Sequence, residues 1–394
     1  MPTTENKRGV FALMVAHCAG MLDLVALPVW VGTLIVQYRF DPQQAGGLAT
    51  LFLIGASLAS VVFAPRFTRH KPRQMAVAGF ALAAVAFIVA SQNAAFPMLA
   101  VLHLLGGMAA GMALSFTHGT IGHAANPHRV FALVGLAIGI FGIAFLGGTP
   151  GIVTKFGGPA LFLVFAGVMA AAALVGLFFF PGITRRIVSD QAEATNAHLQ
   201  PLGRAVWFSV FAIALLAMVQ AMTLSFFESI GLARGFGRDN VTLALVIYGI
   251  VTLFPAPLAA LLEKRLPATT VICTVPVFQA VFAMTVTHTS SYPLYAASGA
   301  LMAFTILFTH TYAFGLLARL DPTGRAVAGT PAMLMVGAAV APFLGGTLVK
   351  FIGFEAIGYA AIMLVAIELA LFNETRKAVL HRPTVAPQGR VVYP

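Results

Sequence analysis

Phe145-Leu146-Gly147-Gly148-Thr149 recurs unchanged as Phe343-Leu344-Gly345-Gly346-Thr347, 198 residues later (343 − 145). Phe116-Thr117-His118 recurs as Phe308-Thr309-His310 at a spacing of 192. Two looser matches are both spaced by 195 residues: Asn126-Pro127 with Asp321-Pro322, and Lys155-Phe156-Gly157-Gly158 with Lys350-Phe351-Ile352-Gly353. Four matches in one order, at nearly one offset, indicate that each half of the chain repeats the same structural plan.

The composition is that of a protein embedded in a lipid bilayer. Hydrophobic residues make up 59% of the 394 residues and charged residues 9%, whereas soluble domains have roughly 45–50% and about 25%. Apolar runs of about 20 residues are long enough to cross a bilayer, and the chain has twelve of them. They lie near residues 10–36, 44–64, 74–92, 96–121, 129–152, 158–180, 205–230, 240–262, 268–288, 292–317, 326–349 and 355–373.

The longest polar interval, 182–204, falls between the sixth and seventh runs, where the duplication predicts a boundary. We therefore expect an N-terminal six-helix bundle over 1–181, a cytoplasmic linker over 182–204, and a C-terminal six-helix bundle with a short cytoplasmic tail over 205–394. The predicted fold is all-α, with twelve transmembrane helices in two pseudo-symmetric bundles. Tandem duplication of membrane helices is typical of secondary transporters.

The basic residues predict which side each loop faces. We assign both termini and the loops after even-numbered spans to one side of the membrane. That side then holds 18 of the 23 Lys and Arg residues, and the other side holds five: Arg39, Lys155, Arg234, Arg238 and Lys350. Basic loops stay in the cytoplasm, so both termini are expected there. Because the net charge of +11 is spread over short loops, it indicates topology and not a nucleic-acid partner.

Local motifs agree with one family. The loop from Ala64 to Arg73 is similar to the basic loop of the major facilitator superfamily, with Arg66, Arg69 and Arg73 as its gating residues. Ala64 stands where that family usually has Gly, and Thr68 where it has an acidic residue. His103 begins a run of small residues in span four, where the family has Arg. Ala341-Pro342-Phe343-Leu344-Gly345-Gly346 in span eleven is similar to an antiporter motif that the family carries in span five. The chain thus resembles a twelve-helix transporter of this superfamily.

The resemblance implies that spans one, four, seven and ten line a central cavity. Charge in hydrocarbon is costly, so ionisable residues inside spans normally face water or a partner. Glu368, on span twelve, is expected to reach toward Arg376 or water at the cytoplasmic end. The other candidates fall on the four lining spans: Asp23 and Glu228 for proton coupling, and His103, His118 and His310 for the substrate cavity.

Asp23 is the strongest candidate for proton coupling. It lies at the midpoint of the first span, and no Lys or Arg lies inside a predicted span to neutralise it. Desolvation favours the protonated form and water the charged form, as a proton carrier requires. The alternative is a permanently protonated acid that hydrogen-bonds across helices. For Glu228 the alternative is contact with water or Arg234.

The remaining cavity residues are predicted from spacing and polarity. On span four, His103, Gly107, Gly111, Ser115 and His118 advance by three or four residues and form one stripe. The alternative is a helix-packing seam whose histidines hydrogen-bond to a neighbour. Further candidates are Trp30, on the face of Asp23, and the polar residues Gln220, Tyr248 and Gln279.

The expected function is secondary active transport of a small organic molecule by alternating access, coupled to protons, by a monomer in a bacterial inner membrane. The expected cavity holds histidines but no Lys or Arg, so a neutral, weakly cationic or amphipathic substrate is favoured, with efflux as the direction. The alternatives are a proton-independent uniporter and a non-transporting receptor. No phosphate-binding loop or metal-ligand spacing is found, so we expect no cofactor, metal or enzymatic activity.

Overall fold

The computed structural model describes Thr4 and residues 6–182, 202–321, 326 and 330–380, and this part of the chain contains helices and no strand. The all-α prediction is confirmed. The helices are α1 (Lys7–Gly20), α2 (Leu22–Val36), α3 (Pro42–Phe63), η1 (Ala64–Arg69), α4 (Pro72–Ser91), α5 (Phe96–Gly122), α6 (Pro127–Phe156), α7 (Pro159–Phe179), α9 (Arg204–Ala233), α10 (Arg238–Val251), α11 (Pro255–Leu262), α12 (Ala268–His288), α13 (Tyr292–Leu320), α15 (Thr330–Phe351) and α16 (Glu355–Leu380).

Twelve segments of the described chain are long and apolar enough to cross a membrane, which confirms the predicted number. Two of them are interrupted: α1 and α2 form the first span, and α10 and α11 form the eighth. Pro42, Pro72 and Pro159 open α3, α4 and α7. Proline suits a first turn because it has no N–H group to leave without an intrahelical acceptor.

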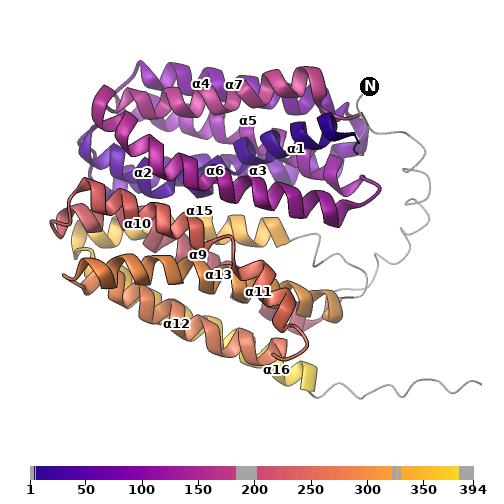
Figure 1. The fold of residues 1–394 in the computed structure, drawn as a ribbon, viewed down its shortest axis with the longest axis vertical. Coiled ribbons are helices and arrows are strands. Elements are labelled where there is room, and N and C mark those ends of the chain that lie inside the picture. The colour runs from indigo at the N-terminus through magenta and orange to yellow at the C-terminus, as the bar shows by residue number, and fades with distance from the viewer. Residues whose placement is uncertain (1–3, 5, 183–201, 322–325, 327–329, 381–394) are drawn as a thin grey trace, which may run out of the picture.

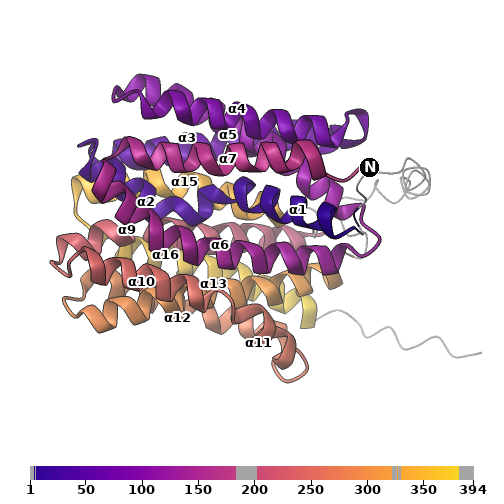
Figure 2. The same ribbon diagram turned by 45° about the horizontal axis from the view of Figure 1, so that its top comes forward.

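The spans form two six-helix bundles, which lie one above the other in Figure 1 and partly overlap in the turned view of Figure 2. The first bundle contains α1 to α7 and the second α9 to α16. Equivalent helices have equivalent neighbours: α4 packs against α5 and α7, and α12 packs against α13 and α16. The start of α1 and the end of α16 lie on the same side of the molecule (Figure 1). This arrangement confirms the two pseudo-symmetric bundles.

The bundles meet along α3 and α15, along α6 and α10, and where α2 packs on α9. Between α3 and α15 the backbones touch. A Cβ atom on Gly46 would overlap the carbonyl oxygen of Pro342, and one on Gly346 would overlap the carbonyl oxygen of Pro42. Glycine is therefore required on both sides of this contact, which we call the glycine seam.

The first copy of the repeated pentapeptide packs differently. Gly148 is the equivalent of Gly346 by sequence, yet a Cβ atom on Gly148 would meet nothing within 4 Å. Its neighbour Gly147 would meet only the end of the Val246 side chain on α10, at 3.1 Å. The two copies therefore have the same sequence, but the second copy packs more closely against the other bundle than the first copy does.

Asp41 links the start of α3 to α15. Its carboxylate caps α3 by accepting from the backbone N–H of Gln44 at 2.9 Å, and Lys350 donates to the other carboxylate oxygen at 3.0 Å. Partial burial alone would raise the pKa of Asp41. The Gln44 N–H and the Lys350 ammonium stabilise the carboxylate more strongly, so the pKa lies below its ordinary value.

We expect Asp41→Asn to lower the free energy of unfolding by only about 0.2–1 kcal/mol, because the ion pair is partly exposed and asparagine keeps the helix cap. Asp41→Ala also removes the cap and should cost roughly 1 kcal/mol more. Since the folded state stabilises the carboxylate, the contribution is present above the ordinary pKa of about 3.9. It is lost as pH falls through the lower folded value.

Thermal unfolding in detergent, from neutral pH down to about pH 3, measures this effect. Asp41→Asn should reduce the loss of stability on acidification relative to the wild type. An unchanged dependence on pH would show that the Asp41–Lys350 pair contributes nothing.

Candidate functional site

Asp23 lies where the first span is interrupted. Helix α1 ends at Gly20, Met21 leaves the helical conformation with φ −106° and ψ 14°, and α2 begins at Leu22. The first N–H groups of a helix have no intrahelical acceptor, and the Asp23 carboxylate accepts from one of them, Leu24 N, at 2.9 Å. Asp23 is only 3% exposed. The break therefore holds a buried carboxyl at the positive end of a half-helix.

Packing is close just before the break. A Cβ atom on Gly20 would lie 2.6 Å from Leu114 Cδ1, so α1 approaches α5 closely just before the chain leaves the helix. Beyond the break, α2 contacts α3, α6 and α7 of its own bundle and α9 of the other. Asp23 is thus carried by a helix that touches both bundles.

His17 and His118 form a pair that joins α1 to α5. His17 Nδ1 lies 3.0 Å from His118 Nε2, and the two ring centroids are 5.2 Å apart. At this distance one nitrogen donates and the other accepts, so the pair holds a single hydrogen between its rings. His17 is 8% exposed. His17 falls within the first apolar run, 10–36, but the sequence gives no reason to pair it with a residue 101 positions away.

His103 and Trp30 lie in the interior of the first bundle. His103 is fully buried, and its Nε2 accepts from Trp30 Nε1 at 3.3 Å while its Nδ1 lies 2.6 Å from the Leu99 carbonyl oxygen. Both ring nitrogens therefore have partners. The rings around this pair are those of Phe52, Phe87, Phe162 and Phe165.

The small residues that follow His103 form a packing seam. Cβ atoms on Gly107 and Gly111 would overlap the carbonyl oxygens of Phe52 and Ala56 on α3. This part of the stripe packs as the seam alternative describes, and the cavity role expected of His103 and Trp30 stays a prediction.

Gln220 and Tyr248, both predicted cavity residues, lie together. The side-chain nitrogen of Gln220 on α9 donates to the Tyr248 hydroxyl on α10 at 3.0 Å. The amide oxygen of Gln220 is buried and has no hydrogen-bond partner in the described structure. This oxygen is therefore an acceptor that the described structure leaves unused.

Glu228 lies against α2 and pairs with α10. Its carboxylate is in contact distance of Gly32, where a Cβ atom would lie 3.1 Å from Oε2. Its Oε1 is 3.8 Å from Arg238 Nη1. Arg234, named in the alternative interpretation of Glu228, pairs instead with Glu355 at 2.5 Å. Glu228 is 5% exposed and its Oε2 has no partner in the described structure.

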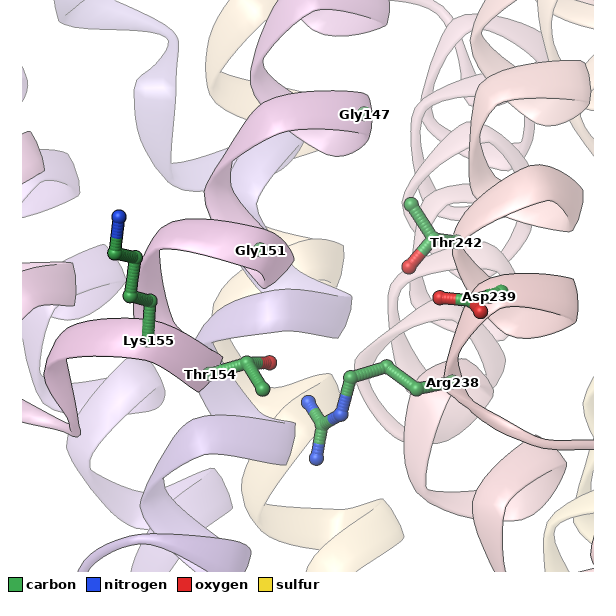
Figure 3. Close-up of a pocket in the computed structure, with 7 residues that line it drawn as sticks. All are labelled: Gly147, Gly151, Thr154, Lys155, Arg238, Asp239 and Thr242. Carbon is green, nitrogen blue, oxygen red and sulfur yellow. The ribbon is translucent and has the colours of Figure 1, made fainter.

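Arg238 also lines a cavity of about 370 Å³ between α6 and α10. Figure 3 shows its side chain extending across the gap toward Thr154, whereas the side chain of Lys155 points away. Gly147 and Gly151 leave the α6 wall without side chains. The Glu228–Arg238 pair thus lies beside an opening between the bundles.

Gln279 and His310 belong to the second bundle. Gln279 is fully buried, and its side-chain nitrogen donates to the Leu216 carbonyl oxygen at 3.1 Å. His310 stacks on Phe314 with ring centroids 4.9 Å apart, and its Nδ1 is buried without a partner in the described structure. His310 therefore has no neighbour equivalent to the His17 that pairs with His118.

The expectation for Glu368 is wrong. Helix α16 continues to Leu380, which puts Glu368 near its middle instead of near the cytoplasmic end. The side chain is 0% exposed, and neither carboxylate oxygen has a partner in the described structure. It therefore does not reach Arg376 or water.

The basic loop is held by an aromatic residue. Phe67 in η1 packs on Phe116 and His123 with ring centroids 5.7 and 5.0 Å away, and Gly119 leaves room for its ring. Arg66 donates to the Val62 carbonyl oxygen. In the described structure, no ion pair involves the predicted gating residues Arg66, Arg69 and Arg73.

No group of three or more His, Cys, Asp or Glu side chains in the described residues is arranged to hold a metal ion. The site consists instead of buried proton-binding and hydrogen-bonding groups: Asp23, the His17–His118 pair, the Gln220–Tyr248 pair and the Glu228–Arg238 pair. These groups can exchange protons and bind polar parts of a ligand.

Comparison with known proteins gives one consistent result. The sequence model of the Major Facilitator Superfamily matches residues 12–330, and no curated protein matches the sequence. A bacterial homologue of the human lysosomal transporter Spinster, in an inward-facing and occupied conformation, superposes with a TM-score of 0.77 at 11% identity, over 96% of this chain and 98% of that chain. The nucleoside transporter NupG superposes with a TM-score of 0.69 at 13% identity, over 95% of this chain and 99% of that chain.

Proposed function

Because the chain belongs to the Major Facilitator Superfamily, it is a membrane transporter, and we propose that it moves a small organic molecule by alternating access, with Asp23 carrying a coupling proton. In this mechanism the two bundles rock against each other, so that a site between them faces one side of the membrane at a time. The two-bundle fold, which is similar to that of an inward-facing carrier, supports the proposal.

The burial and position of Asp23 are the observation that carries the proton coupling. Asp23 is 3% exposed, at the break of a span that contacts both bundles. No Lys or Arg of the described chain lies within ion-pair distance of it. A neutral acid is stable while the site is dry, and water entering the site stabilises the charged form. Protonation therefore biases the direction in which the bundles open.

The polar groups favour a substrate that is neutral, weakly cationic or amphipathic. Gln220 offers an unpartnered oxygen beside the Tyr248 hydroxyl, and the His17–His118 pair offers ring nitrogens. Arg238 and Lys155 line the cavity between α6 and α10, but they lie near helix ends. The other described Lys and Arg residues lie in loops or near helix ends too, so none is deep in the bundles to bind an anion. The 33 Phe and 15 Met residues supply apolar, adaptable walls. Efflux of such compounds is the direction we propose.

We further propose that a monomer lies in a bacterial inner membrane with both termini in the cytoplasm. The described ends of the chain lie on one side (Figure 1), and the distribution of basic loops favours that side as cytoplasmic. The bundles then comprise 1–181 and 205–394, joined by a linker over 182–204, of which 183–201 lie outside the described residues. In this orientation the glycine seam closes the outer face.

Reconstituted vesicles with an imposed pH gradient test the function. We expect a panel of neutral and weakly cationic organic compounds to contain at least one that accumulates against its gradient, and that the accumulation collapses when a protonophore removes the pH gradient. Transport that only equilibrates the compound would indicate a uniporter. Binding without transport would indicate a receptor, and either result would overturn the proposed coupling.

A further inference from the structure

Helices α12 and α16 of the second bundle carry three buried acceptor oxygens that have no hydrogen-bond partner in the described structure. They are both carboxylate oxygens of Glu368 on α16 and the side-chain oxygen of Gln279 on α12. Both residues are 0% exposed. An unpaired buried acceptor costs free energy, and an unpaired buried carboxylate costs far more.

Hydrogen bonds fix the relative positions of these groups. Thr375 Oγ1 on α16 lies 3.1 Å from Ser209 Oγ on α9. Seven residues make about two helical turns, so moving by seven along each antiparallel helix brings Glu368 opposite Leu216. The Leu216 carbonyl oxygen is the group to which the Gln279 nitrogen donates.

A contact at the other ends of α12 and α16 also indicates that Gln279 and Glu368 lie at the same height along the helix axes. The rings of His288 and Tyr359 lie edge to face with centroids 5.1 Å apart. Gln279 lies nine residues before His288, and Glu368 lies nine residues after Tyr359 (288 − 279 and 368 − 359). The two helices are antiparallel, so both side chains come to one level of the bundle, and their complete burial turns them inward.

We propose that Glu368 and Gln279 form a proton-binding site, separate from Asp23, in which a protonated Glu368 donates to the oxygen of Gln279. The Gln279 nitrogen is already used by Leu216, so its oxygen is the group that remains to accept. One bound proton removes the buried charge and satisfies an acceptor on each helix. A sodium ion in its place would need about six oxygen ligands, as hard cations of this size do, and this set is too small.

Other titratable groups lie away from this level. On the helices packed against α16, Cys273 of α12 and Arg204 of α9 lie toward the cytoplasmic end, and His288, Glu228 and Lys350 lie toward the other end. Along α16 itself, Arg376 is eight residues away, or about 12 Å along the axis, and is within interaction distance of Cys273. No described group is therefore in position to replace the proton.

Infrared spectroscopy of the full-length protein in lipid tests the site, because the carbonyl stretch of a protonated carboxylic acid is separate from the carboxylate and amide bands. At neutral pH, the difference spectrum obtained by subtracting the spectrum of Glu368→Gln from that of the wild type should contain one protonated-acid band, and this band should shift in D₂O. Gln279→Leu should keep this band but move it to higher frequency, since the acid loses its acceptor. Glu374→Gln, which changes an exposed glutamate on the same helix, should leave the protonated-acid band unchanged.

The protonated-acid band must persist in the Asp23→Asn variant. This measurement separates the Glu368 site from the proposed role of Asp23, and it can still be made if the Glu368 variant does not fold. Absence of a protonated-acid band in Asp23→Asn would overturn the proposal. So would its removal by sodium at constant pH, because the site would then bind a cation in place of a proton.

Discussion

Asp23→Asn is expected to abolish accumulation driven by a pH gradient while the protein still inserts, binds substrate and exchanges it. Asparagine resembles the neutral acid and can accept from the same Leu24 N–H that Asp23 accepts from at 2.9 Å, so the break between α1 and α2 should survive. Only the exchange of a proton is removed. Net accumulation should fall at least about tenfold, which corresponds to about 1.4 kcal/mol of lost coupling.

Accumulation measured in vesicles with a pH gradient reports proton coupling, and substrate exchange measured in vesicles without a gradient reports binding and transport by this variant. Glu263→Gln is the matched control, because Glu263 is 68% exposed and lies outside the helices; it should transport as the wild type does. Full gradient-driven accumulation by Asp23→Asn would exclude Asp23 from the mechanism and leave Glu228, beside Arg238, as the next carboxyl to test.

Gly46→Ala and Gly47→Ala are expected to have opposite effects although they are neighbours. The methyl group at 46 overlaps the Pro342 carbonyl oxygen, whereas the one at 47 meets the Phe343 ring at an ordinary 3.6 Å. Overpacking of a backbone contact costs typically 1–3 kcal/mol. An alanine that fits replaces glycine in a helix with a gain of roughly 0.5–1 kcal/mol.

Thermal unfolding of the two variants in one detergent measures these effects. Gly46→Ala should unfold at a lower temperature than the wild type, and Gly47→Ala at the same or a higher temperature. Equal stability of the two variants would show that α3 and α15 are not in backbone contact in the stable form of the protein.

The helices could be predicted from the sequence because apolar length and the internal repeat depend only on residues near one another in the chain. The break at Met21 could not be predicted, since residues 10–36 form one apolar run, and the close contact of Leu114 with Gly20 beside the break joins residues far apart in sequence. The end of α16 was placed too early because polar residues after 373 were taken to end the helix, and Glu368 was therefore expected near water.

The candidate site was predicted less completely, for a physical reason. Spacing shows which residues share a face of a helix, but not which helix that face meets. The stripe after His103 was therefore recognised, while its contact with α3 was not. The pairing of His17 with His118, and of Gln220 with Tyr248, likewise requires the positions of two helices that are far apart in sequence.

The glycine seam also affects the kinetics of the transport cycle. Its closest contacts, around Gly46 and Gly346, are made by backbone atoms, which have no rotamers to adjust when the helices begin to separate. Packed interfaces of this kind have discrete states and do not deform gradually. In the proposed transport cycle, we therefore expect the face that the glycine seam closes to open in a single step with few partly open molecules, which would limit the leak of protons across the membrane during each turnover.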